Sequence, residues 1–215
     1  MEIELAGLLG ISLVIATILL SMTFHEAMHA FTSHWLGDDT AYLMGRLTLN
    51  PLKHIDPILT IALPILLILA GLPPFGAAKP VPFNPYRVKY GEYGAALVGV
   101  AGPLTNLVLA LVIGLWTRFV VGFDAGVLSD VLQIFVLVNL GFFVFNMIPW
   151  PPLDGSRLLY AFAPESLQDF MKSIERGGFL YIMIFMFFIY GLIAPFVARA
   201  IEGLYEVIMG IPLIL

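Results

Sequence analysis

The order of apolar and polar positions divides the chain into long hydrophobic runs, separated by short polar or proline-rich connections. A helix needs about 20 mostly apolar residues to cross the hydrocarbon core of a bilayer. A shorter run, 58–72, has Pro64 at its centre, and proline interrupts the hydrogen bonds of a helix. The longer runs each predict a membrane-spanning helix, and they cover residues 5–31, 94–121, 131–148 and 178–198.

The connections and the tail predict different structures. Residues 41–49 are rich in Tyr, Leu and Thr and predict a short strand at the membrane surface. Residues 73–93 are rich in proline and predict an extended chain. The tail, residues 195–215, carries three charged side chains and predicts an interfacial helix or a short sixth span. No internal repeat is evident, so nothing in the sequence favours an inverted-repeat transporter.

The composition agrees with a chain that is embedded in a lipid bilayer. Hydrophobic residues make up 60% of the sequence and charged residues only 12%, whereas a soluble domain has about 25% charged residues. The mean hydropathy is +0.97. These values exclude a soluble enzyme, and the formal net charge of −5 argues against a nucleic-acid partner. The absence of Cys excludes disulfides and thiolate metal ligands.

We therefore predict an all-α polytopic membrane protein. It should have about five or six transmembrane helices and a re-entrant or membrane-surface extended segment. Residues 1–215 should form a single domain, with a catalytic core over about 5–160 and C-terminal helices over about 165–215.

The positions of the ten Lys and Arg residues bear on how run 58–72 meets the membrane. If this run crosses fully, the basic residues divide almost evenly between the two sides. If it enters and returns, only Arg118 and Arg199 lie opposite the others, as expected when the basic side is cytoplasmic. We therefore predict a re-entrant run that places these residues on one side: Arg46, Lys53, Lys79, Arg87, Lys89, Arg157, Lys172 and Arg176.

A metal-binding pattern, H-E-x-x-H, lies at the polar end of the first run. Positions i and i+4 share one face of a helix, so His25 and His29 can bind one metal ion. Glu26 can then act as a general base on a metal-bound water. Two imidazoles suit Zn²⁺, one per chain, with a third ligand and an open position for water. Because ionisable groups within a span are costly, they favour a functional site over a chance pattern.

The third ligand has to be a carboxylate or another histidine, and Asp154 is the best candidate. The prolines within 149–152 cannot continue the fourth run as a helix, so the chain is extended where that span ends. Alternatively, Asp154 is the N-cap of the short amphipathic stretch that follows it. The residues by themselves leave both interpretations open. A re-entrant run 58–72 would place His29 and Asp154 on the same side of the membrane, where they can meet.

Three motifs and their order in the chain resemble those of the site-2 proteases, a family of zinc intramembrane metalloproteases. They are HEAMH at 25–29, GPLTN at 102–106 and FNMIPWPPLDGSRLL at 145–159. The stretches NPLKHIDP and AKPVPFNP also resemble the compact bacterial and archaeal members. Ser156 stands where many members have a second Gly, a departure that leaves the proposed ligands intact.

The resemblance implies that His25, His29 and Asp154 bind zinc and that Glu26 activates the zinc-bound water. Asn146 occupies the place of an Asn in the family pattern, and its amide can donate to the scissile carbonyl. The implied function is an intramembrane endopeptidase that cleaves transmembrane segments of membrane proteins. The compact members imply an integral protein of the plasma membrane of a prokaryote. No feature of the sequence indicates an oligomeric state.

Two other functions compete with this interpretation. One is a membrane transporter or channel with His and Asp as ion ligands, and the other is an inert zinc-binding membrane scaffold. Glu26 argues against both, because neither needs a general base beside the metal. Among the other polar residues, Asn106 is predicted to line the cleft or to join helices, and His34 to lie at the interface. His54 is predicted to lie in a surface loop, and it is the next candidate for a third ligand.

Overall fold

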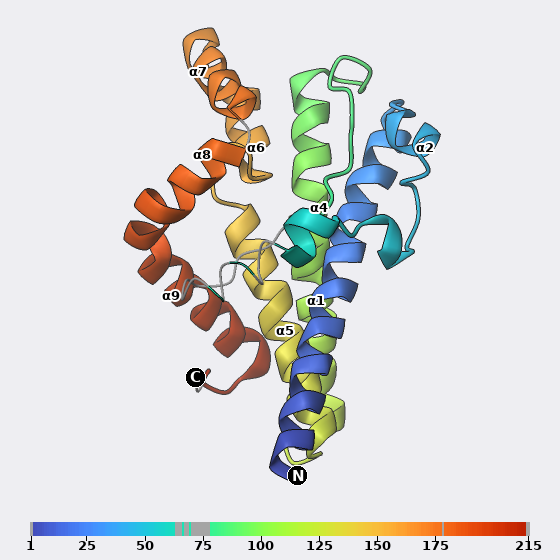
Figure 1. Cartoon of the computed structure of the whole chain (residues 1–215), viewed down its shortest axis with the longest axis vertical. Coiled ribbons are helices and arrows are strands. Elements are labelled where there is room, and N and C mark those ends of the chain that lie inside the picture. Colours follow the sequence, from blue (N-terminus) through green and yellow to red (C-terminus); the bar gives the residue numbers. More distant parts are fainter. Residues whose placement is uncertain (1, 63–65, 67–68, 70–77, 178, 214–215) are drawn as a thin grey trace.

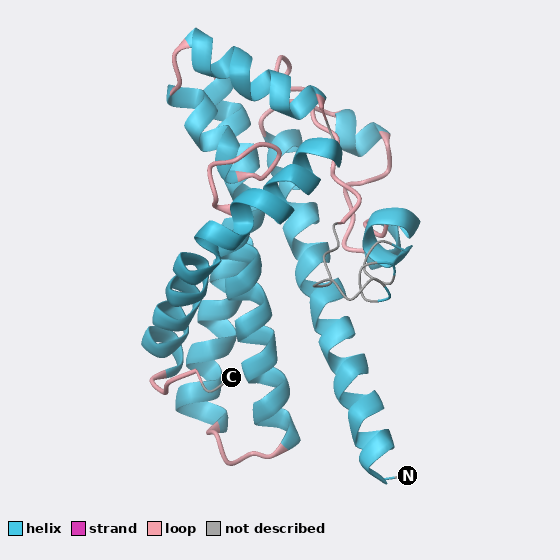
Figure 2. Cartoon of the chain, turned by 60° about the vertical axis from the view of Figure 1, so that its left-hand side comes forward, coloured by secondary structure: helices cyan, strands magenta, loops and turns pink. Residues whose placement is uncertain are grey.

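The computed structural model describes residues 2–62, 66, 69, 78–177 and 179–213. This part of the chain consists of helices joined by turns and loops and contains no strand (Figure 2). This confirms the predicted all-α class of a polytopic membrane protein. Within the described residues, the helices that are long and apolar enough to cross a membrane cover Ser12–Trp35, Glu92–Val121, Val127–Asn146 and Phe185–Met209.

The described elements follow the hydrophobic runs, with shorter helices in the connections. In chain order they are α1 (Glu2–Trp35), α2 (Thr40–Leu43), η1 (Pro51–Lys53), η2 (Pro57–Ala62), α4 (Glu92–Trp116), η3 (Thr117–Val121), α5 (Val127–Asn146), α6 (Gly155–Phe162), α7 (Glu165–Arg176), α8 (Phe179–Ile184), η4 (Phe185–Ile189) and α9 (Tyr190–Met209).

Helices α1, α4 and α5 lie side by side and form the centre of the molecule (Figure 1). The buried residues of the first half of α4 are mostly small, from Gly94 to Gly102, and small residues allow the backbones of membrane helices to approach closely. Helix α9 leans against α5. Its last turns complete a buried apolar cluster of Ala110, Val136, Leu140, Tyr205, Ile208 and Met209.

Two predicted elements differ from the structure. The strand predicted over 41–49 was wrong: Thr40–Leu43 is a short helix, because the carboxylate of Asp38 accepts hydrogen bonds from both the N–H and the hydroxyl of Thr40. A turn at Gly45, with a φ of 66°, then reverses the chain. The fifth run and the tail, predicted as separate segments, join in one helical stretch from α8 through η4 to α9, with Pro195 inside it.

The run predicted to be re-entrant, 58–72, lies mostly outside the described residues. Its flanking residues meet, however, because the N–H of Lys79 donates to the carbonyl of His54 over 2.9 Å. A segment that crossed the membrane once would leave its two ends on opposite sides. His54 and Lys79, which precede and follow this run, lie in hydrogen-bond contact instead.

Candidate metal centre

Two histidines of α1 and one aspartate that precedes α6 converge at the end of the bundle. The Nε2 atom of His25 lies 3.0 Å from Oδ2 of Asp154, and Nε2 of His29 lies 3.4 Å from the same oxygen. One donor atom from each of the three side chains lies within 4.8 Å of the other two. Two imidazole nitrogens and one carboxylate oxygen are a donor set that fits zinc and leaves a fourth position open. Among the described residues, no other group of three such side chains converges in this way.

Both imidazoles are oriented through their second nitrogen atom. Nδ1 of His29 lies 2.7 Å from the carbonyl oxygen of Val98, and Nδ1 of His25 lies 2.6 Å from Oδ1 of Asn106. An oxygen acceptor at Nδ1 places the proton there and leaves the lone pair of Nε2 available to a metal. Helix α4 therefore selects the tautomer of both histidines.

The orientation of Asn106 is itself determined by buried polar groups. Its Nδ2 donates to Oδ1 of Asn139 over 2.8 Å and to the carbonyl of Ser21 over 3.3 Å. Nδ2 of Asn139 donates in turn to the hydroxyl of Ser21 over 2.8 Å. Because the backbone carbonyl of Ser21 can only accept, Nδ2 of Asn106 points toward it and Oδ1 faces His25. All three side chains are fully buried.

Asp154 reaches the histidines because α5 ends at Asn146 and the proline-rich segment carries the chain back toward α1. It occupies the position before α6, but its side chain makes no capping hydrogen bond. The capping interpretation was therefore wrong, since the carboxylate points to the two imidazoles instead.

Helix α4 approaches the two histidines closely because it has no side chain at Gly102. A Cβ atom built at Gly102 would lie 2.7 Å from Nε2 of His25 and would overlap the ring of His29. At Gly99, one turn earlier, a Cβ atom would lie 2.7 Å from Cβ of Arg157. These two glycines leave room for the donor atoms and for the segment that carries Asp154.

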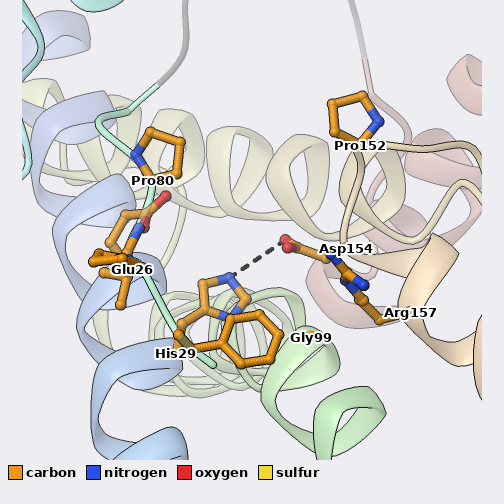
Figure 3. Close-up of a pocket in the computed structure, with 10 residues that line it drawn as sticks. Glu26, His29, Pro80, Gly99, Pro152, Asp154 and Arg157 are labelled. Carbon is orange, nitrogen blue, oxygen red and sulfur yellow. Dashed lines mark hydrogen bonds and ion pairs between the residues drawn. The ribbon is translucent and has the colours of Figure 1, made fainter. Parts of the chain in front are cut away.

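A cavity of about 310 Å³ opens beside the three side chains. Glu26 lies on one wall, and its Oε2 accepts a hydrogen bond of 2.9 Å from the N–H of Val81. Figure 3 shows Glu26 and Pro80 on one side of the cavity and Asp154, Arg157 and Pro152 on the other. The complete lining is Glu26, His29, Pro80, Val81, Pro82, Phe83, Gly99, Pro152, Asp154 and Arg157.

The structure places the other candidate residues away from this cavity lining. Nδ2 of Asn146 donates to the carbonyl of Phe142, one turn earlier in α5, over 3.0 Å. His54 lies in a loop, but it is fully buried rather than at the surface, and its Nε2 is hydrogen-bonded to the carbonyl of Thr48 over 2.8 Å. His34 is partly exposed and pairs with Asp39 over 2.7 Å.

Sequence reasoning missed several residues around the candidate metal centre. Asn139 and Ser21 are polar positions within apolar runs, and that intramembrane location was a signal that could have identified them. The roles of Val81 and Val98 depend on backbone atoms, for which the side-chain pattern carries no signal.

Comparison with known protein families identifies part of the chain. The model of peptidase family M50 matches residues 121–190, a range that includes Asp154 and ends well after it. The matched range does not include the histidines of α1. The family assignment therefore also draws on relatives that match more of the chain.

The chain is similar to curated bacterial proteins. It is 37% identical over 179 residues to "Putative zinc metalloprotease YwhC" of Bacillus subtilis, an alignment that covers 79% of this chain and 78% of the relative. It is 34% identical over 181 residues to "Putative zinc metalloprotease Rip2" of Mycolicibacterium smegmatis, covering 81% of this chain and 66% of the relative. It is 31% identical over 173 residues to "Putative zinc metalloprotease Rip2" of Mycobacterium tuberculosis strain H37Rv, an alignment that covers 80% of this chain and 65% of the relative. The chain thus spans about two thirds of the mycobacterial relatives. No solved structure matches it significantly.

Proposed function

Since this chain belongs to peptidase family M50, the site-2 proteases, and is a zinc metalloprotease of the membrane, we propose that it cleaves transmembrane segments of membrane proteins. One observation carries the proposal: the donor atoms of His25, His29 and Asp154 converge beside a cavity that Glu26 also lines. A binding site or an ion pathway would not need that fourth group.

We assign His25, His29 and Asp154 as the ligands of one zinc ion per chain. Zinc bound there supplies Lewis-acid chemistry, which makes a water molecule more acidic and polarises a carbonyl group. The residues of the chain orient these ligands. Val98 and Asn106 fix the histidine tautomers, and the proline-rich segment after α5 delivers Asp154.

Glu26 is assigned as the general base. It takes a proton from a water molecule as the water oxygen bonds to the carbonyl carbon of the substrate. It then returns this proton to the peptide nitrogen as the C–N bond breaks, so that the products are a carboxylic acid and an amine. Asn146 is the predicted donor to the carbonyl oxygen. To reach it, the Asn146 amide would exchange its hydrogen bond to Phe142 for one to the substrate.

The expected substrate is a transmembrane segment that is locally unwound. A peptide bond inside a helix is shielded by the hydrogen bonds and side chains around it, so an extended stretch has to enter the cavity. Pro80–Phe83 lies beside Glu26 without helical structure, and Pro152, Asp154 and Arg157 line the opposite wall. Pro80 and Pro82 have no N–H, so this segment would bind an extended substrate mainly through its carbonyl groups, which can accept hydrogen bonds from the substrate backbone.

We also propose that residues 1–215 form one domain, with the catalytic core in residues 5–160. The four candidate spans and the bacterial relatives support a multi-pass protein of a prokaryotic plasma membrane.

The test uses purified protein in detergent and a panel of transmembrane peptides. We expect zinc in the protein, cleavage of at least one peptide, and loss of cleavage in Glu26→Gln with zinc retained. Loss of the general base should reduce kcat by about 10²–10⁴-fold. Glu26→Gln with normal cleavage would contradict the mechanism. Ion flux into liposomes without any peptide cleavage would support a transporter instead.

A further inference from the structure

The general base Glu26 is hydrogen-bonded to a backbone segment from a distant part of the sequence. We call residues Lys79–Asn84 the strap. It passes over Glu26 and forms one wall of the cavity, where Figure 3 shows Pro80 next to Glu26. The N–H of Val81 donates to Oε2 of Glu26 over 2.9 Å, and both residues are about 9% exposed. This contact joins positions that are 55 residues apart.

The sequence of the strap restricts which backbone groups can make such a contact. Val81 lies between Pro80 and Pro82, and proline has no backbone N–H. Val81 is therefore the one residue of these three that can donate a backbone hydrogen bond, and it donates to Glu26. Proline also restricts the backbone around Val81 to extended conformations, so the donor is held in a fixed direction.

Buried charged side chains anchor the strap at both ends. Nη2 of Arg46 donates to the carbonyl of Lys79 over 2.5 Å, and Oδ2 of Asp38 accepts from the N–H of Asn84 over 2.6 Å. Arg46 is 6% exposed and Asp38 is fully buried. Hydrogen bonds to charged groups are about twice as strong as neutral ones. The position of the Val81 N–H is therefore fixed by contacts outside the cavity.

We propose that the backbone N–H of Val81 is a positioning donor for the general base, which holds Oε2 of Glu26 and directs Oε1 toward the water. This inference rests on the proposed function, because it assumes that Glu26 is the base. A carboxylate without such a donor would rotate among several orientations, and misplacement of a catalytic group by about 1 Å can cost about 10²-fold in rate. The strap thus acts on proton transfer through Glu26 and does not bind the metal.

The test compares two substitutions at the same position. Val81→Pro removes the N–H and suits the extended conformation of the strap, but its ring carbon Cδ replaces the hydrogen and pushes against Oε2 of Glu26. Val81→Ala removes most of the side chain and keeps the N–H. We expect kcat of Val81→Pro to be about 10- to 100-fold lower than that of Val81→Ala, since a hydrogen bond to a charged group is lost. KM for a cleaved transmembrane peptide, zinc content and thermal unfolding temperature should match between the two variants.

A second variant separates loss of the hydrogen bond from misfolding of Val81→Pro and from displacement of Glu26 by the proline ring. Replacement of Val81 by its α-hydroxy acid converts one amide to an ester and removes only the N–H. It should reproduce the loss of kcat with zinc retained. If this variant turns over like the wild-type protein, the positioning role is refuted.

Glu26→Gln in the same assay separates the two proposals. If Glu26→Gln is inactive while the ester variant is fully active, only the inference about Val81 fails. If Glu26→Gln is itself active, the proposed mechanism fails.

Discussion

Oδ1 of Asn106 in α4 lies 2.6 Å from Nδ1 of His25 in α1, although the two residues are 81 positions apart in the chain. This contact is buried and connects the metal centre to a chain of hydrogen bonds through Asn139 and Ser21. Partners of this kind orient metal-binding histidines and raise the basicity of the imidazole. We therefore expect Asn106 to contribute to zinc binding without contacting the metal.

Asn106→Ala should weaken zinc binding. The substitution removes the acceptor that keeps the proton on Nδ1 of His25, so we expect zinc affinity to fall by about 10- to 100-fold. Competition with a metal chelator of known affinity measures this change. Asn139→Ala is the matched control, because it removes a buried amide one step further along the same network and should have a smaller effect. Equal zinc affinities for Asn106→Ala and the wild-type protein would show that Asn106 only joins the helices.

Gly102→Ala should block the metal centre. The added methyl group would lie 2.7 Å from Nε2 of His25 and would overlap the ring of His29. Gly141→Ala is a good control, because it lies inside α5 and nothing lies within 4 Å of its built Cβ. In both variants alanine has a higher helix propensity than the glycine it replaces, by about 1 kcal/mol, so this contribution is the same for the two.

We expect Gly102→Ala to lose zinc affinity by about tenfold or more, the magnitude seen when the surroundings of a metal site are disturbed. Gly141→Ala should retain full zinc occupancy. Full occupancy of both variants, measured by elemental mass spectrometry, would show that the histidines can move away from α4 without losing the metal.

Removal of any one ligand should reduce the zinc content. His25→Ala, His29→Ala and Asp154→Ala each take away one of three converging donors. Elemental analysis of the purified variants should give well below one zinc per chain, against one in the wild-type protein. Chelation of the wild-type metal should also lower the thermal unfolding temperature, because a ligand at 100 times its Kd stabilises the folded state by about 2.7 kcal/mol. If Asp154→Ala retains both zinc and activity, His54→Ala becomes the next variant to measure.

The parts of the fold that the sequence predicts are those with strong local signals. The long apolar runs become helices, and the spacing of His25 and His29 places both on one face of α1. The convergence of Asp154 on this face agrees with the prolines that end α5 and with the proposed topology. These features depend on spacing, on hydrophobic length and on residues that cannot continue a helix.

The remaining features depend on contacts between distant segments. One carboxylate oxygen of Asp38 accepts from the N–H of Asn84, 46 residues away, and the other accepts from Thr40 at the start of the short helix 40–43, where the local sequence predicted a strand. The bond between Val81 and Glu26 comes from a backbone N–H, which every residue except proline has. The partner of a given carboxylate therefore follows from the packing of the strap and not from the local sequence.

Labelling of introduced cysteines should show that the two ends of run 58–72 share one side of the membrane. The structure supports this topology, because Lys79 is hydrogen-bonded to His54. We expect Lys53→Cys, Lys79→Cys and Lys172→Cys to react with an impermeant thiol reagent from the same, cytoplasmic, side. Asp124→Cys, in the exposed connection between η3 and α5, should react only from the opposite side. The native chain has no Cys, so each label reports a single position.

The result bears directly on the metal centre. His29 and Asp154 lie 3.4 Å apart between Nε2 and Oδ2, which requires the end of α1 and the end of α5 to share one side. If Lys79→Cys reacted from the side opposite to Lys53→Cys, run 58–72 would cross the membrane. The ends of α1 and α5 would then lie on opposite sides, and Asp154 could not contribute to a zinc site with His25 and His29. Reaction of both cysteines from one side keeps all three ligands at the same end of the bundle.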